Sequence, residues 1–501
     1  MIPENDAEKR VLAAFRAGKR EVLVKGEVIG GDFLRWLFLG EDDKKAGYRG
    51  TCIVGAIISD VLNMEFCEAK FPVRFRNCSF ASKIKLQQLT CPELGFSGCT
   101  LKKGIDALGA KVAGDVHLTK VNAQDQVRLS GAAIGGQLDC TGGSFRNKGK
   151  IALNAQGIKV AGIVFLCNEF NAEGAVWLLG AEIGGQLICR GSFQNEGRNA
   201  LIAQSVKVAA DVLLVPPKHG QKEEWENFSA NGQVSFANAT IGGDLELKNC
   251  ELTHLSLAGT SVSGEFEDDA EVYKNDQGND IVLNIDGFRY QRLNAVKERV
   301  KDRLAWVGLM SQGGKFYPQP YEQLMQVYRA TGHTNWARDV GFELEKKRQE
   351  VMESWLWKGW YSVLRITIGY GYKPFRALAC WLIPLIAMGF ILFSGILPCP
   401  DPCRTESAPC HCMAPSDAEV LLSEDWKMHG KLPKDYPGFN PVYYAVEAAL
   451  PVLPLGQTEN WHPKTWWVRW VQGAITIIGA LILAILASYG VGVLGPRWKN
   501  E

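Results

Sequence analysis

A repeated motif of short apolar runs around a pair of small residues constrains the fold of this chain most strongly. The second small residue of successive motifs recurs at spacings of 22, 26, 23, 25, 33 and 21 residues. These positions are Gly114, Gly136, Gly162, Gly185, Ala210, Gly243 and Gly264. The clearest copies are LSGAAIGGQLDCTGGSF (129–145), LLGAEIGGQLICRGSF (178–193) and FANATIGGDLELKNCEL (236–252), and an early copy, EVIGGDFL, starts at Glu27. A period of this size is typical of a solenoid.

Each unit consists of an apolar-x-apolar run, a small-residue corner and a second apolar-x-apolar run. Such alternation points one face of a strand inward, and glycine permits a sharp corner. A leucine-rich repeat is the competing solenoid, but the units lack its asparagine ladder and a helical half. We therefore predict a right-handed parallel β-helix over residues 26–287, after an N-terminal helix and cap over 1–25. The insertion 216–227 explains the 33-residue spacing, and the repeat fades after Glu267.

Two long segments without charged residues, Ala377–Leu397 and Trp470–Leu494, dominate the C-terminal part. Each is long enough to cross a bilayer, which takes about 20 apolar residues as a helix. We predict a two-span membrane domain over 377–494 with an external loop over 398–465, and a cytoplasmic tail over 495–501. Residues 288–376 are expected to form helices that couple the two domains and end in an interfacial segment.

Charge gives these spans an orientation. Residues 288–376 contain 16 Lys and Arg against 8 Asp and Glu, a net of +8, and the tail GPRWKNE is also basic. Basic residues flank both spans on the same side, so the positive-inside rule places both termini in the cytoplasm. The chain opens on MIPENDAEKR, which has no apolar signal region. We expect a multi-pass protein of the cell inner membrane, with the cysteines of the repeat region reduced.

Between the two spans, residues 440–457 indicate a short apolar helix followed by a Pro/Gly-rich loop. Pro441 suits the first turn of a helix, and Pro451 ends it. This segment either re-enters the membrane between the spans or lies on its outer surface. Its candidate pore residues are Glu447, Leu453, Leu455, Gly456 and Gln457.

In the second span, small residues recur every four positions at Thr476, Ala480, Ala484, Ser488 and Gly492. A stripe of this kind lets helices approach closely. It could contact the first span, contact another subunit or line a pore, and the first four residues are candidate pore residues.

The external loop contains four cysteines in the segment CPDPCRTESAPCHC: Cys399, Cys403, Cys410 and Cys412. They could bind zinc together with His411, or form two disulfides in an oxidising space. The topology favours disulfides.

Two familiar motifs are misplaced. Thr367–Gly371 spells a potassium selectivity filter, but it precedes the first span, whereas a filter must be held at membrane depth. Gly490–Gly495 spells a dinucleotide fingerprint, but it lacks the strand before and the helix after. The seven histidines are scattered. We therefore predict no catalytic cluster, no metal site, no cofactor and no enzymatic activity.

Three motifs support a resemblance to a family: YRATGHTNWARDV with the following basic run, Tyr370–Pro374 before the first span, and PVLPLGQ before the second. With them the chain resembles bacterial proteins that join a β-helical or pentapeptide-like solenoid to a two-span, channel-like module. The architecture is also similar to the channel effector of the Hailong antiphage defence system. That resemblance implies a homotetrameric channel controlled by a nucleotide or oligonucleotide second messenger from a partner nucleotidyltransferase.

The sequence thus predicts an oligomeric ion channel in a lipid bilayer, gated through its cytoplasmic β-helix by a ligand. The sequence does not identify the residues that bind this ligand. The alternative is a membrane-anchored β-helix without a pore, which polymerises or serves as a scaffold. Covered solenoid ends favour the channel, and bare apolar ends favour a polymer.

Overall fold

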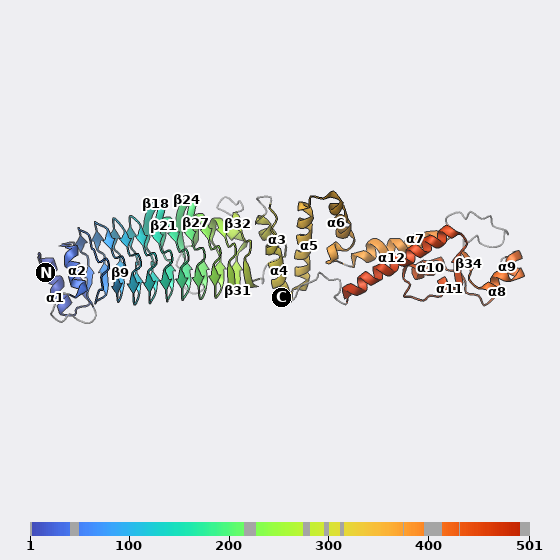
Figure 1. Ribbon diagram of the computed structural model, residues 1–501, viewed down its shortest axis with the longest axis horizontal. Helices are drawn as coiled ribbons and strands as arrows, with labels where there is room; N and C mark the ends of the chain where they lie inside the picture. Colours follow the sequence, from blue (N-terminus) through green and yellow to red (C-terminus); the bar gives the residue numbers. More distant parts are fainter. Residues whose placement is uncertain are drawn as a thin grey trace. The chain divides into compact units, whose positions relative to one another are not determined.

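The computed structural model describes residues 3–40, 50–214, 227–273, 281–294, 300–310, 315–373, 375–394, 413–429 and 431–490. The chain forms two compact units, Met1–Val340 and Gly341–Glu501. Figure 1 shows the helices and strands within each unit.

Unit 1 contains a β-solenoid of about ten coils (Figure 1). One coil comprises β12 (Lys111–Val112), β13 (Val116–His117), β14 (Asn122–Ala123) and β15 (Val127–Arg128), and β16 (Ala133–Ile134) then pairs with β12. The coil therefore has four short sides, and every pairing described in the two large sheets is parallel. The predicted parallel β-helix is confirmed at this level.

The strands follow one another along four faces. The first face contains β1 (Glu21–Leu23), β3 (Cys52–Val54), β5 (Val73–Arg76), β9 (Leu94–Ser97), β13, β17 (Leu138–Asp139), β20 (Val164–Leu166), β23 (Leu187–Cys189), β26 (Val212–Leu214), β29 (Leu245–Leu247) and β31 (Ser261–Asp268). The neighbouring face, which belongs to the same sheet, contains β8 (Thr90–Cys91), β12, β16, β19 (Lys159–Val160), β22 (Glu182–Ile183), β25 (Lys207–Val208), β28 (Thr240–Ile241), β31 and β33 (Arg289–Leu293).

The second sheet supplies the other two faces. It contains β2 (Val28–Ile29), β4 (Ile57–Ile58), β6 (Ser79–Phe80), β7 (Ile84–Lys85), β10 (Thr100–Leu101), β11 (Ile105–Asp106), β14, β15, β18 (Ser144–Asn154), β21 (Asn171–Trp177), β24 (Gly191–Ile202), β27 (Phe228–Ser235), β30 (Glu251–Ser256) and β32 (Val282–Asn284).

The small-residue corners of the repeat stack into a hydrogen-bonded column. The amides of Gly136, Gly162 and Gly185 each donate to the carbonyl of the preceding corner residue, at 2.9, 2.7 and 3.0 Å. The amides of Ala210, Gly243 and Gly264 continue the column. Its longest hydrogen bond, 3.4 Å, runs from the Ala210 amide to the Gly185 carbonyl. A Cβ at Gly162 would lie 2.8 Å from the carbonyl oxygen of Gly136. Close stacking of backbones therefore explains why the repeat requires small residues here.

Side chains of equivalent positions stack inside the coils. The rings of Phe145, Phe170, Phe193 and Phe228 follow one another at 5.4, 5.1 and 5.0 Å between centroids. Aromatic pairs at such distances add to the stabilisation from burial. The ten described cysteines are free thiols, and those of the solenoid are buried except for the half-buried Cys67.

Two helices cover the N-terminal end of the solenoid. α1 (Asp6–Arg16) starts at the N-cap Asn5, whose side chain accepts a hydrogen bond from the Glu8 amide at 2.8 Å. The expected early repeat copy is only partly a coil, because its second half forms α2 (Gly31–Leu39). Phe38 of α2 is buried and packs edge-to-face on Phe75 of the solenoid, with 5.7 Å between centroids. The apolar spacing of GDFLRWLFL suits a helix better than a strand.

The other end of the solenoid is covered as well. Strands continue to Leu293, beyond the point where the repeat fades, and α3 (Val300–Gly308) follows. Trp306 of α3 lies 5.9 Å from the Phe266 ring, and Arg303 forms a fully buried ion pair with Asp268. α4 (Gln319–Ala330) adds side-chain amides, since Gln323 donates to the carbonyl of Tyr290 at 2.7 Å.

α4 ends before Gly332, and α5 (Thr334–Val351) follows it. α5 continues across the boundary between the two units.

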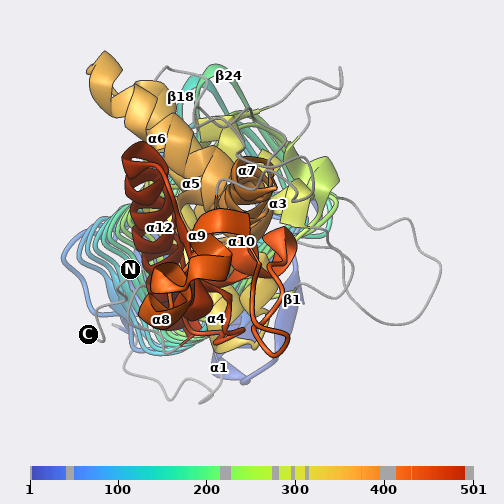
Figure 2. The ribbon, with the colours of Figure 1, turned by 90° about the vertical axis from the view of Figure 1, so that its right-hand side faces the viewer.

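Unit 2 is mainly helical (Figure 2). After α5 its elements are α6 (Trp355–Thr367), η3 (Gly369–Gly371), η4 (Leu378–Leu382), α7 (Ile383–Phe393), β34 (Met413–Pro415), α8 (Ala418–Leu422), α9 (Glu424–His429), α10 (Pro441–Ala449), α11 (Gln457–Asn460), β35 (Trp461–Pro463) and α12 (Trp466–Gly490). Among the described helices, one is long and apolar enough to cross a membrane, over Trp466–Ala484 of α12. The helix at the first expected span is apolar but shorter, Leu378–Phe393, and 395–397 lie outside the described residues.

Candidate pore module

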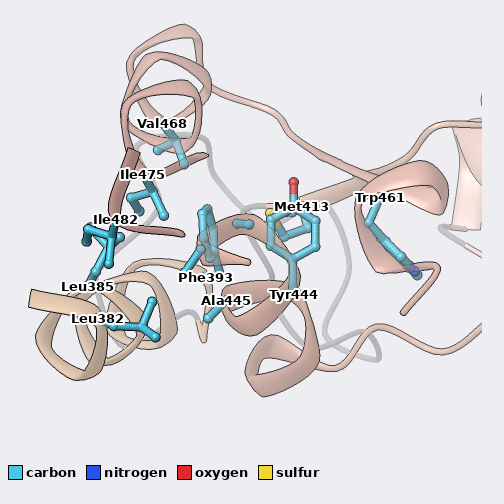
Figure 3. Close-up of a cluster of buried hydrophobic side chains, with 12 residues drawn as sticks. Leu382, Leu385, Phe393, Met413, Tyr444, Ala445, Trp461, Val468, Ile475 and Ile482 are labelled. Atoms are coloured by element: carbon cyan, nitrogen blue, oxygen red, sulfur yellow. The ribbon is translucent and has the colours of Figure 1, made fainter. Parts of the chain in front are cut away.

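Three helices and a two-stranded antiparallel sheet share one apolar core in unit 2 (Figure 3). Residues of α7, α10 and α12 meet in it, together with Met413 of β34 and Trp461 of β35. Its buried members are Leu382, Leu385, Phe393, Met413, Tyr444, Ala445, Ala448, Ala449, Trp461, Val468, Ile475 and Ile482. The short helix α10 packs against both longer helices, α7 and α12.

Two glycines let α10 approach its neighbours closely. A Cβ at Gly389 of α7 would lie 3.3 Å from the Ala445 Cβ. A Cβ at Gly479 of α12 would lie only 1.9 Å from the carbonyl oxygen of Ala449, the last residue of α10. Helices that pack without a hydrophobic driving force rely on such small residues.

The contact with Gly479 fixes how far α10 extends along α12. Gly479 lies thirteen residues after Trp466 and eleven before Gly490, which are the ends of α12. At 1.5 Å per residue, the end of α10 is therefore about 20 Å from the start of α12, near its middle. The sequence left two arrangements open for 440–457, a re-entrant segment and a segment on the outer membrane surface. Backbone at membrane depth must be buried or line water. The burial of α10 between α7 and α12 therefore suits the re-entrant arrangement.

The start of α10 agrees with the sequence-based expectation. Pro441 is its first residue, and the side chain of the N-cap Asn440 accepts hydrogen bonds from the amides of Val442 and Tyr443 at 3.0 and 3.2 Å. Proline fits the first turn because that position needs no amide donor. The helix ends at Ala449, two residues before Pro451.

Two of the candidate pore residues have a positioning role within the single chain. Glu447 and Gln457 are each only 7% exposed. One carboxylate oxygen of Glu447 accepts hydrogen bonds from the amides of Gln457 and Thr458, at 2.7 and 3.0 Å. The Gln457 side chain in turn accepts from the Asn440 amide at 2.9 Å and donates to the carbonyl of Gly438. These contacts join both ends of α10 to the start of α11, where the loop that follows α10 ends.

The other loop candidates are exposed. Leu453 and Leu455 are 45% and 43% exposed, and Gly456 has φ +73°, a conformation that favours glycine. In the single chain the apolar side chains of this loop therefore meet solvent, although burial of such groups is favourable.

The stripe of α12 lies away from its packed face. Thr476 is half-buried and donates to the Gln472 carbonyl at 3.1 Å, while Ala480 and Ala484 are exposed. The contacts with α7 and α10 are made by Val468, Ile475, Gly479 and Ile482 instead. The described stripe residues are therefore not among the buried members of this core, and a contact with the first span, a subunit contact and a pore lining all stay predictions. The Ser488 side chain lies outside the described residues.

The filter-like segment has an ordinary structural role, as expected. Thr367 ends α6, and Tyr370 adopts a left-handed turn with φ 55°. The Tyr370 hydroxyl donates to the side chain of Gln349 in α5. Sequence reasoning missed both Gln349 and Gly479, although a glycine inside an apolar helix could have indicated a close approach.

Metal and disulfide sites are not found within the described ranges. No group of three or more His, Cys, Asp or Glu in them could hold a metal ion. The loop cysteines Cys399, Cys403, Cys410 and Cys412 lie outside the described residues, so the disulfides stay a prediction.

The solenoid carries a polar surface pocket of about 530 Å³ near its N-terminal end. Arg20, Arg74, Arg76 and His117 line it together with Glu21 and Glu93. Arg76 pairs with Glu21 at 2.7 Å, and Arg74 lies 3.8 Å from Glu93. A guanidinium group can bind a phosphate through two parallel hydrogen bonds, so an anionic ligand here would compete with Glu21 and Glu93 for Arg76 and Arg74.

Comparison of the chain with protein-family models, with curated proteins and with solved structures finds no match.

Proposed function

We propose that this protein is an oligomeric membrane ion channel whose pore module is built from α7, α10 and α12. The observation that carries the proposal is the short helix α10, held between two apolar helices with its end at the middle of α12. Two membrane spans cannot enclose a pore alone, so several copies, four in our proposal, would meet around an axis.

The exposed stripe of α12 supports this assembly. Ala480 is exposed while Ile475 and Gly479 pack inside the unit, so the face of small residues remains available to an axis or to another subunit. In a tetramer the exposed loop residues Leu453 and Leu455 would approach the same axis. We propose an inner-membrane location with both termini in the cytoplasm, on the basis of the positively charged flanks.

A signal received by the solenoid would control the pore. A ligand shifts a conformational equilibrium only if it binds the two states differently. We propose a nucleotide or oligonucleotide second messenger from a partner nucleotidyltransferase, acting in antiviral defence. The pocket with Arg74 and Arg76 is the candidate site, because its guanidinium groups can bind phosphate.

Flux measurements with purified full-length protein in liposomes test the channel. We expect ion flux with at least one of a panel of cyclic and linear oligonucleotides, and a closed oligomer by mass. The absence of flux under every condition would refute the channel. Replacing both Arg74 and Arg76 with Ala should abolish the nucleotide response while leaving the oligomer intact. An unchanged response would exclude the pocket.

A cysteine pair tests which face of α12 meets water. We expect a charged, membrane-impermeant thiol reagent to block flux through the Ala480→Cys variant. The matched Leu481→Cys variant carries its thiol on an exposed residue about 100° further around the helix, where we expect lipid. Equal inhibition of the two variants would contradict a pore lined by the stripe.

The alternative function is a membrane-anchored scaffold or polymer without a pore. Coil-on-coil polymerisation needs bare solenoid ends, but α1, α2, α3 and α4 cover the described ends. This observation favours the channel over an end-to-end polymer.

A further inference from the structure

The polar side of α6 faces its own protein. Gln349 of α5 is only 9% exposed, and its side-chain amide donates to the carbonyl of Lys358 at 2.9 Å and to the Ser362 hydroxyl at 2.7 Å. Tyr370 contacts both helices. Its hydroxyl donates to the side-chain oxygen of Gln349, and its ring centroid lies 5.9 Å from that of Tyr361 in α6. The hydrogen-bonding side of the helix is therefore joined to α5 and to the turn that follows α6.

The apolar side of α6 faces outward. None of its thirteen described residues is buried. Its large apolar side chains are 42–77% exposed, and they are Trp355, Leu356, Trp357, Trp360, Val363 and Ile366. This is the reverse of a helix on a soluble domain, whose apolar stripe packs against the core. α1 shows the ordinary arrangement in the same chain, since Val11 and Phe15 are buried.

We propose that α6 lies in the interfacial layer of a bilayer, with this apolar side inserted at the boundary of headgroups and acyl chains. The proposal rests on the membrane location proposed for α7 and α12. Tryptophan is enriched at that boundary, and α6 carries three tryptophans on its outward side. Lys358 and Arg365 add two cations beside it, which suit anionic headgroups.

Chain connectivity favours lipid over a second copy as the occupant. α6 ends at Thr367 and the apolar helix of the first span begins at Leu378, so only ten residues separate them. Within that stretch Phe375 is 76% exposed. The exposed apolar surface thus continues along the chain from α6 into the span. An amphipathic helix in this position binds by buried apolar area and by attraction to anionic lipids.

A labelling experiment in vesicles tests the depth of α6. The full-length protein would have Cys67, Cys380 and the loop cysteines Cys399, Cys403, Cys410 and Cys412 replaced by Ser. It would carry an environment-sensitive fluorophore at Val363→Cys on the outward side or at Lys358→Cys on the polar side. The vesicles would contain phosphatidylcholine and phosphatidylglycerol. We expect a spin label at a shallow acyl position to quench the fluorophore at 363 several-fold more strongly than the one at 358.

Three outcomes oppose the proposal. Equal accessibility of both labels to an aqueous quencher would overturn it. Protection of the 363 label from both the aqueous and the lipid quencher would assign the surface to a second copy. Weak lipid quenching at 363 together with normal ion flux would overturn the α6 proposal while leaving the channel intact. Strong lipid quenching without flux would support the α6 proposal and refute the channel instead.

Discussion

Replacing Gly479 with Ala should disrupt the module that we assign to the pore. The added Cβ would lie 1.9 Å from the Ala449 carbonyl oxygen, 2.7 Å from its carbonyl carbon and 3.2 Å from its Cα. These are backbone atoms at the end of α10, so no side-chain rotation relieves the clash. To restore an ordinary contact of about 3.2 Å, α12 must move away from α10 by roughly 1.3 Å, and overpacking of this kind costs roughly 1–3 kcal/mol.

Gly473→Ala is the matched control in the same helix. A Cβ there has no described atom within 4 Å, so the substitution creates no clash. It should instead remove the helix penalty of glycine, about 1 kcal/mol relative to alanine. Thermal unfolding in detergent should therefore show a lower midpoint for Gly479→Ala and an equal or higher one for Gly473→Ala.

Liposome flux adds the functional measurement. We expect Gly479→Ala to reduce flux because the end of α10 loses its position against α12. If the two alanine variants show the same midpoint and the same flux, the close approach of α10 and α12 is wrong, and so is the depth that we assign to α10.

Three further predictions address other parts of the chain. Asp268→Asn removes the carboxylate from the buried ion pair with Arg303 and should lower the stability of unit 1 by about 3–5 kcal/mol in denaturant unfolding, whereas Asp6→Asn, in an exposed pair, should cause no measurable change. Glu447→Gln should weaken the hydrogen bonds that hold the loop after α10, and faster proteolysis of that loop would reveal it. Burial raises the pKa of the Cys91 thiol to about 12, so Cys91 should resist alkylation in the folded chain at pH 8 and react after denaturation. Alkylation of folded Cys91 at pH 8 would contradict its burial.

The sequence was sufficient for the solenoid because the determining contacts repeat. Each corner residue stacks its backbone on the preceding one, so a glycine or alanine recurs at this corner in successive coils from Gly114 to Gly264. The start of α10 was also predictable, since Asn440 and Pro441 act within one helical turn. Local and periodic constraints of this kind leave a direct pattern in the sequence.

Contacts between distant segments leave a weaker pattern. Glu447 is the only charge in 440–457, and that isolation predicts a pore residue, but it gave no sign that the carboxylate accepts hydrogen bonds from the amides of Gln457 and Thr458. The strand β33 lies beyond the predicted end of the β-helix at residue 287, and it contacts α4 side chains such as Gln323 rather than another coil. The helix α2 was hidden because Gly30–Gly31 matches the repeat corner.

The sequence left two functions open, a membrane channel and a polymer without a pore. The two functions require exposed apolar surface at different places in the chain. A polymer that grows coil on coil would expose apolar side chains at its ends, but Phe38 is buried beneath one cap and Phe266 packs against Trp306 at the other. Unit 1 exposes a few large apolar side chains, such as Phe66, but most of those that are exposed lie in unit 2. On α6, α7 and α12, Trp360, Ile383 and Leu481 are each more than half exposed. A surface of this composition cannot remain in water without favouring association. The surface that needs a partner therefore belongs to unit 2, and a bilayer and neighbouring subunits account for it better than growth of the solenoid does.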